Sequence, residues 1–124
     1  MQTIICMKWG NRYNHEYVNR LYKSITKHTK IKTRLICFTD NVKKIHEQII
    51  CKPLPKILIP EEISFTPWRK LSVWQFPLYD LEGDVLFLDL DLVVTGNLDK
   101  FFHHKKGKFC VIENWTQIGK GIGN

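Results

Sequence analysis

The sequence predicts an α/β fold in which a mostly parallel sheet is flanked by helices. Apolar, strand-like segments alternate along the chain with amphipathic helical ones, as in repeated βαβ units. In addition, Val85–Leu88 is an apolar run without alternation, which is typical of a strand covered on both faces. With 124 residues, the chain is expected to form a single domain, residues 1–124.

The N-terminal half is expected to begin with a strand–helix–strand unit. Asn14 is a suitable N-cap for a helix that runs to about His28, because the apolar residues between them recur on one helical face. Turn-prone residues, Thr39 to Asn41, follow the second strand. The other elements expected in this half are strands at Thr3–Met7, Arg34–Phe38 and Ile49–Leu54 and a short helix at Val42–Gln48.

In the C-terminal half, proline and asparagine mark the expected helix starts. Pro67 suits the first helical position, where its missing N–H is not needed, and Pro77 limits the helix expected over Trp68–Gln75. Asn97 is expected to cap a short helical turn through Phe102. The remaining elements are a central strand at Val85–Leu88, a strand at Phe109–Glu113 and a glycine-rich tail, Trp115–Asn124.

Composition limits the classes of partner and the cellular location that the sequence predicts. The net charge of +7 favours anionic partners, yet the basic residues are scattered and form no stripe interleaved with aromatics, so no nucleic-acid partner is expected. No apolar run is long enough to span a bilayer, and no basic region precedes an apolar core at the N-terminus. The four cysteines lack C-x-x-C spacing, which favours free thiols. These features predict a cytoplasmic protein, with peripheral contact at an anionic inner membrane face as a further option.

Two aspartates follow the apolar run in the segment D-V-L-F-L-D-L-D-L-V-V-T-G-N-L. In extended backbone, Asp89 and Asp91 would point the same way, at the strand end where open α/β sheets bind ligands. Converging carboxylates repel each other unless a cation lies between them, and Mn²⁺ or Mg²⁺ prefers such oxygen ligands. The alternative is that both acids only cap loops.

Several sequence blocks recur in the order and spacing of one enzyme family. They are I-I-C-M-K-W-G-N-R-Y, E-Y-V-N-R-L-Y, C-F-T-D-N, W-R-K-L and V-L-F-L-D-L-D-L-V-V-T-G-N-L-D-K-F-F. With them the chain resembles a bacterial glycosyltransferase of the GT-A fold, close to the family 8 type that works on cell-surface polysaccharide or lipopolysaccharide. The resemblance implies a Rossmann-like nucleotide-sugar-binding region and metal-dependent hexosyl transfer from a UDP-sugar to a saccharide or lipid-linked acceptor.

The resemblance also implies roles for particular residues. Asp89 and Asp91 would hold the metal against the diphosphate, and Lys70 would neutralise phosphate charge. Asp40 would bind the base or ribose, and the backbone near Leu90 would approach the ribose. The nucleotide base would lie in the loop after the first strand, which contributes Lys8, Trp9, Gly10 and Tyr13. Ordinary structural roles compete with each assignment: loop aromatics, a turn aspartate and a solvated lysine.

The chain departs from the family pattern in three respects. Lys8 and Trp9 stand where many relatives place an acid, no histidine corresponds to the usual third metal ligand, and the acceptor-binding half is absent. A truncated chain that binds a nucleotide without transferring sugar is therefore expected as one outcome, and no catalytic residue is assigned. A haloacid-dehalogenase-like phosphatase, with Asp89 as nucleophile and Asp91 as acid/base, is a further alternative, although three strand-like segments precede its motif here.

Overall fold

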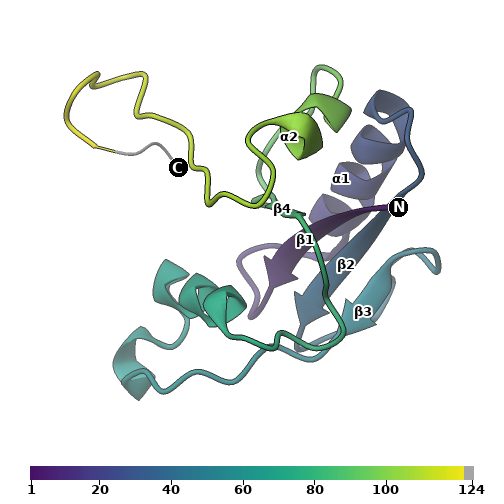
Figure 1. Ribbon diagram of the computed structural model, residues 1–124. Coiled ribbons are helices and arrows are strands. Elements are labelled where there is room, and N and C mark those ends of the chain that lie inside the picture. Colours follow the sequence, from purple (N-terminus) through teal and green to yellow (C-terminus); the bar gives the residue numbers. More distant parts are fainter. Residues whose placement is uncertain (122–124) are drawn as a thin grey trace.

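The computed structural model describes residues 1–121, and the last three residues of the predicted tail, 122–124, lie outside that range. Its centre is a four-stranded parallel sheet in the order β3-β2-β1-β4 (Figure 1). The strands are β1 (Gln2–Lys8), β2 (Thr33–Thr39), β3 (Ile50–Lys52) and β4 (Val85–Phe87). The predicted α/β fold with a parallel sheet is thus confirmed.

The two longest strands, β1 and β2, form the middle of the sheet. They pair along their full length, from Gln2 opposite Thr33 to Lys8 opposite Thr39, and every residue of β1 is buried. In contrast, β4 pairs only with β1 and forms one edge of the sheet in the described chain. The prediction that Val85–Leu88 is a central strand is therefore wrong. Its side chains nevertheless contact both faces of the sheet, since Leu86 packs against one core cluster and Phe87 against the other, whereas Val85 is exposed.

One face of the sheet is covered by α1 (His15–His28). The Asn14 side chain accepts a hydrogen bond from the Glu16 N–H at 3.0 Å, so the predicted N-cap is confirmed. Val18, Leu21 and Ile25 are buried against this face, as the helical periodicity predicts. Burial of these side chains fixes α1 against the sheet as the crossover between β1 and β2.

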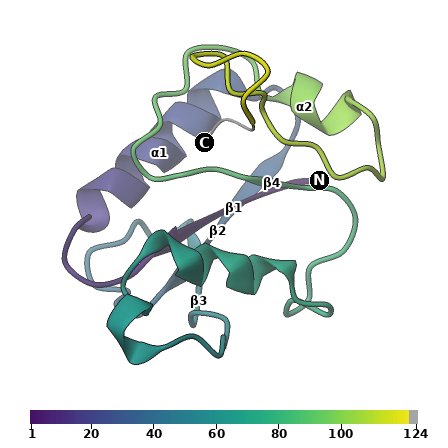
Figure 2. The ribbon, with the colours of Figure 1, turned by 90° about the vertical axis from the view of Figure 1, so that its left-hand side faces the viewer.

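The opposite face is covered by shorter pieces. These are a three-residue 3₁₀ turn, η1 (Glu61–Ile63), and an eight-residue 3₁₀ helix, η2 (Pro67–Trp74). Figure 2 shows α1 and η2 on opposite sides of the sheet. The helix predicted near Pro67 thus exists, but its i→i+3 hydrogen bonds give the tighter 3₁₀ form. Of its side chains, Val73 packs against the core on this face, whereas Trp68, Leu71 and Trp74 are exposed.

The short helix predicted at Val42–Gln48 is absent, and this segment consists of turns. Asn19 of α1 binds its backbone twice: the amide donates to the Lys44 carbonyl at 2.9 Å, and the amide oxygen accepts from the His46 N–H at 2.8 Å. Lys44 also has a left-handed backbone, with φ 61°. These backbone groups are therefore engaged by a side chain and cannot enter an α-helical pattern.

After β4 the chain forms α2 (Asp99–His103), whose N-cap is Leu98 and not the predicted Asn97. The Asn97 side chain lies one residue earlier and accepts a hydrogen bond from the Asp99 N–H at 2.8 Å. The predicted short helix in this region is confirmed. The strand predicted at Phe109–Glu113 is not: within the described residues only Glu113 makes an isolated bridge, and Phe109, Val111 and Ile112 are exposed. The segment lies apart from the sheet (Figure 1), so its residues have no ladder to join.

The four cysteines are free thiols in the structure, as predicted. Cys6, Cys37 and Cys51 occupy neighbouring register positions on the three adjacent strands β1, β2 and β3. A hydrogen bond with Cys37, together with burial, raises the pKa of the Cys6 thiol well above its ordinary value. Among the described helices, none combines the length and the apolar character that crossing a bilayer requires.

Candidate functional site

The order of the strands defines one preferred place for a ligand. From β1 the chain proceeds to β2 and β3 on one side and later returns to place β4 on the other side of β1. The carboxyl ends of β1 and β4 therefore flank a topological switch point, where open α/β sheets form their binding crevices. The predicted site residues Trp9 and Gly10 directly follow β1, and Asp89 follows β4. The fold thus brings segments that are far apart in the sequence to the carboxyl end of the sheet.

The loop after β1 is anchored at two points. Gly10 adopts φ +62°, a conformation that favours glycine, and its N–H donates to Asp40 Oδ2 at 3.0 Å. The indole N–H of Trp9 donates to the Phe65 carbonyl at 2.8 Å. Asp40 follows β2, so this link joins the ends of the two central strands. The structure therefore brings Trp9, Gly10 and Asp40 together, with one carboxylate oxygen of Asp40 already engaged by the backbone.

Asp89 forms an ion pair with Lys70 of η2, with Lys70 Nζ 2.5 Å from Asp89 Oδ1. The two side chains are 25% and 36% exposed, respectively, so the pair lies at the surface of a hollow rather than in the core. The Lys70 ammonium also lies 6.0 Å from the centroid of the Phe87 ring, on the face of the sheet that η2 covers. The predicted phosphate-binding lysine thus touches one predicted metal ligand.

Asp91 has a different partner. The Tyr13 hydroxyl donates to Asp91 Oδ2 at 3.4 Å, and Tyr13 packs against the core on the α1 side of the sheet. The predicted convergence of the two aspartates assumed extended backbone, but β4 ends at Phe87, and Leu90 and Asp91 form a turn. The turn changes the direction of the second carboxylate. Asp89 is therefore directed to a partner from η2, and Asp91 to a partner beside α1.

The donor chemistry of the two aspartates fits a hard divalent cation. Within residues 1–121, neither Asp89 Oδ2 nor Asp91 Oδ1 has a hydrogen-bond partner, so each carboxylate retains one oxygen for a further ligand. No group of three or more His, Cys, Asp or Glu side chains that could hold a metal occurs in this part of the chain. Magnesium and manganese sites often combine one or two carboxylates with substrate phosphates, and this donor set is compatible with that arrangement.

Two further predicted residues lie at the carboxyl end of the sheet but are buried. Lys8 ends β1, is only 6% exposed and forms no ion pair with any described residue. Its strand parity with Ile4 and Cys6 places it on the α1 side. Leu90 is buried in the turn between the aspartates, so only its backbone is suited to contact a ligand. The positive charge of Lys8 would attract an anion bound at the carboxyl end of the sheet.

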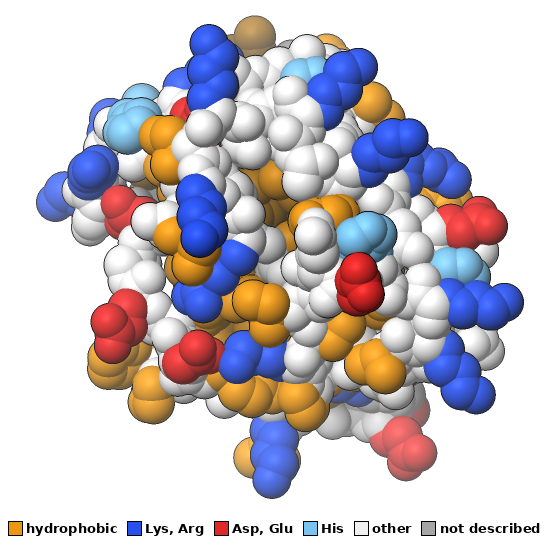
Figure 3. Space-filling model, turned by 90° about the vertical axis from the view of Figure 1, so that its right-hand side faces the viewer, with side chains coloured by type: hydrophobic (Ala, Val, Ile, Leu, Met, Phe, Trp, Pro, Cys, Tyr) orange, Lys and Arg blue, Asp and Glu red, His pale blue; other side chains and the backbone are white. Residues whose placement is uncertain are grey.

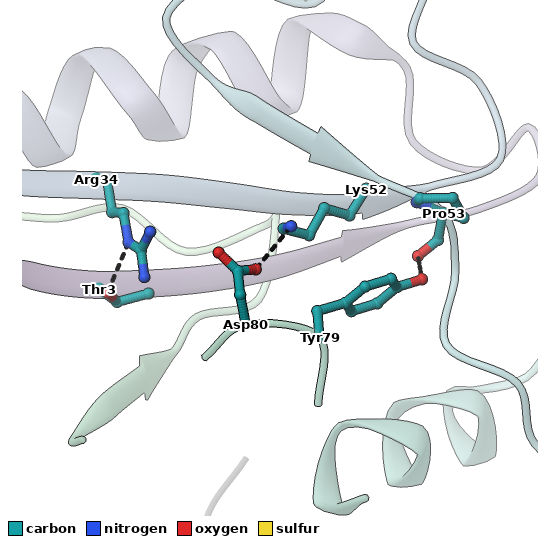
Figure 4. Close-up of polar contacts among 6 residues, drawn as sticks. All are labelled: Thr3, Arg34, Lys52, Pro53, Tyr79 and Asp80. Carbon is teal, nitrogen blue, oxygen red and sulfur yellow. Dashed lines mark hydrogen bonds and ion pairs between the residues drawn. The ribbon is translucent and has the colours of Figure 1, made fainter. Parts of the chain in front are cut away.

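A second hollow, of about 400 Å³, lies beside Asp40 and contains residues that the sequence did not single out. Lys52, the last residue of β3, lines it and forms an ion pair with Asp80 at 2.7 Å, and the Tyr79 hydroxyl donates to the Pro53 carbonyl at 2.7 Å (Figure 4). The hydrogen bond from Lys52 lowers the pKa of Asp80. A charged residue inside the apolar strand predicted at Ile49–Leu54 was the signal that could have identified Lys52.

The surface charge is distributed as the sequence predicted. On the face shown in Figure 3, Lys and Arg side chains are spread among acidic, histidine and hydrophobic side chains and form no continuous stripe.

Comparisons of the chain with protein-family models, with curated proteins and with solved structures gave no match. The functional interpretation therefore depends on the residues and their arrangement.

Proposed function

We propose that this chain is the nucleotide-sugar-binding part of a metal-dependent glycosyltransferase of the GT-A type. In this proposal, the donor is a UDP-hexose, the acceptor is a saccharide or a lipid-linked saccharide, and Mn²⁺ or Mg²⁺ assists. The observation that supports it best is the meeting of the predicted residues at one switch point: Gly10 with Asp40, Asp89 with Lys70, and Asp91 with Tyr13. Four separate sequence blocks of the resemblance supply these pairs.

The chain's own residues would bind and orient the donor. The loop at Trp9 and Gly10, held by Asp40, would present backbone and an aromatic ring to the nucleoside. Lys70 and Lys8 would place positive charge near the diphosphate, whose negative charge grows as the sugar bond breaks. Asp89 and Asp91 would hold the divalent cation, which supplies further charge neutralisation on the leaving diphosphate.

Calorimetric titration of the whole chain with UDP, with and without Mn²⁺, tests the proposal. Replacing Asp89 or Asp91 by Asn removes a charged ligand, so each variant is expected to weaken Mn²⁺-assisted UDP binding at least about tenfold, or roughly 1.4 kcal/mol. Asp84→Asn is the matched control, because Asp84 precedes β4 at its opposite end and contacts the Gly107 N–H instead. Unchanged Mn²⁺-assisted binding in both Asp89→Asn and Asp91→Asn would overturn the metal assignment.

A second candidate is nucleotide binding without sugar transfer. The ion pair of Lys70 with Asp89 favours it, because a resident ammonium already neutralises one of the two aspartates. The two candidates differ in a UDP-glucose turnover assay: only the transferase releases UDP from the bound sugar nucleotide. Turnover of p-nitrophenyl phosphate with Mg²⁺ would instead favour the phosphatase alternative, in which Asp89 is the nucleophile.

A further inference from the structure

A large apolar groove adjoins the Asp89–Lys70 pair. Its volume is about 910 Å³, within the range of roughly 300–1,000 Å³ that is typical of small-molecule sites. Its walls come from η2, from the segment after β4, from α2 and from residues 109–112. Lys70 and Asp89 line one part of it, so the groove is continuous with the candidate donor site.

Hydrophobic side chains dominate the lining and remain largely exposed. Trp68 and Trp74 of η2 are 59% and 61% exposed, and Val93 is 81% exposed. Trp74 meets Phe109 edge to face, with 4.7 Å between ring centroids, so two walls touch across the groove. A contiguous exposed apolar surface of this kind marks a place where something apolar binds.

Two of the three charged residues that line the groove are lysines, and the other polar lining residues, Thr66, Thr95 and Asn97, are neutral. Among its lining residues, Asp89 is the only acid, and Lys70 neutralises it, whereas Lys100 has no acidic partner in the described chain. Three more exposed lysines, Lys105, Lys106 and Lys108, directly precede the wall that begins at Phe109. An apolar trough beside a positive rim is complementary to a molecule with an anionic head and a long apolar chain.

We propose that the groove binds the apolar chain of a single amphiphile whose anionic, phosphate-bearing head group contacts the lysines. The identification of this amphiphile as the lipid-linked acceptor of sugar transfer rests on the proposed function. A second copy of the chain is the less suitable occupant. A two-fold interface over this groove would bring two sets of unpaired lysines together, in a chain whose net charge is already +7.

Quenching of tryptophan fluorescence by a brominated dodecyl phosphate tests the groove directly. Bromine quenches only nearby indoles, so a chain lying between Trp68 and Trp74 is expected to reduce emission in a saturable manner below the micelle concentration. The double variant Trp68→Phe with Trp74→Phe is expected to lose most of that quenching, because Trp9 and Trp115 do not line the groove. Quenching that is non-saturable, or that persists in the double variant, would overturn the proposal.

Charged substitutions in the lining provide a second readout. Leu71→Asp or Val93→Asp places a carboxylate in the apolar trough and is expected to weaken binding of the dodecyl phosphate at least about tenfold. Leu58→Asp is the matched control, because Leu58 is fully exposed and lies outside the groove. An equal effect of Leu58→Asp would show that the amphiphile binds non-specifically.

The role of the rim is tested by changing the head group. Replacing Lys105, Lys106 and Lys108 together by Gln is expected to weaken dodecyl phosphate binding several-fold and to leave dodecyl maltoside binding unchanged. Lys23 and Lys27 of α1 and Lys43 after β2 are also exposed but belong to segments that form no wall of the groove, so they serve as the control triple. Equal losses for both detergents would contradict an anion-binding rim.

Two controls separate this inference from the proposed function. Mn²⁺-assisted UDP binding, measured on the same variants, is expected to be unaffected by Val93→Asp. If UDP fails to bind while dodecyl phosphate binds specifically, the groove remains a lipid site but the transferase proposal fails. If UDP binds and dodecyl phosphate does not, the groove proposal fails by itself. Sedimentation that shows a dimer disrupted by Val93→Asp would assign the groove to a second copy and overturn the lipid occupant.

Discussion

The two faces of the sheet are covered in different ways. On one face, the fourteen-residue α1 buries three aliphatic side chains completely or nearly so. On the other face, the eight-residue η2 leaves two tryptophans and a leucine exposed, and long loops complete the cover. The α1 face therefore supports the fold, whereas the η2 face combines modest packing with the Lys70–Asp89 ion pair and an apolar groove. The tighter packing is therefore on the α1 side of the sheet, and the groove that we propose as a binding site involves η2.

The largest effect is expected from a pair of substitutions, one on each face of the sheet, which compares how much the two faces contribute to stability. Leu21→Ala removes a fully buried side chain from beneath α1 and is expected to lower the free energy of unfolding by about 2–5 kcal/mol. Leu71→Ala on η2 is expected to lower it by less than about 1 kcal/mol, because half of that side chain is already in water. Urea unfolding of both variants measures the difference. Similar losses would show that the two faces contribute equally to the fold.

A smaller effect is expected for Lys70→Met, which keeps the stem of the side chain and removes its charge. Since the Lys70–Asp89 pair is partly solvated, unfolding free energy is expected to change by less than about 1 kcal/mol. UDP binding is expected to weaken about tenfold through loss of a phosphate-facing charge. Lys23→Met on α1 is the control and is expected to change neither quantity. A large loss of stability in Lys70→Met would make the lysine structural.

The smallest effect concerns the loop that completes the cover on the η2 side. The hydrogen bond from Lys52 lowers the pKa of Asp80, so the folded state favours the ionised carboxylate. The resulting stability is present above the ordinary aspartate pKa, 3.8, and is lost as the pH falls through the lowered pKa of the folded state. Asp80→Asn is expected to remove this acid dependence, seen as a smaller difference in urea midpoint between pH 7 and pH 3. An unchanged pH dependence would contradict the assignment.

The parts of the fold that the sequence predicted well are those with strong local signals. Local signals specify β1, α1 and β2: the N-cap Asn14, the helical periodicity of apolar residues up to His28 and the apolar strands on either side. No contact with a distant part of the chain is needed to predict them. The segment Val42–Gln48 was predicted wrongly because a distant side chain, Asn19, binds its backbone. Phe109–Glu113 has the composition of a strand, but strand formation needs a neighbour, and composition does not report one.

The candidate site was only partly predictable for a similar reason. The apolar strand before them pointed to Asp89 and Asp91, whereas Lys70 and Gly10 were expected only because the family resemblance implies them. Which of them meet depends on the strand order and on the turn at Leu90, neither of which short motifs specify. The apolar groove was also missed, since it is made of residues that are individually ordinary and become a site only when η2 and the 109–112 segment face each other.

The cysteines on neighbouring strands provide a built-in probe of how the sheet unfolds. Cys110 lies in water, Cys51 is half-covered on the outer strand, and Cys37 and Cys6 are sealed within the sheet. The raised pKa of Cys6 keeps that thiol protonated and slow to react while the sheet is intact. An alkylating reagent would therefore modify Cys110 first, then Cys51, and Cys37 and Cys6 last. Alkylation of each further cysteine in the sheet would report the separation of one more strand.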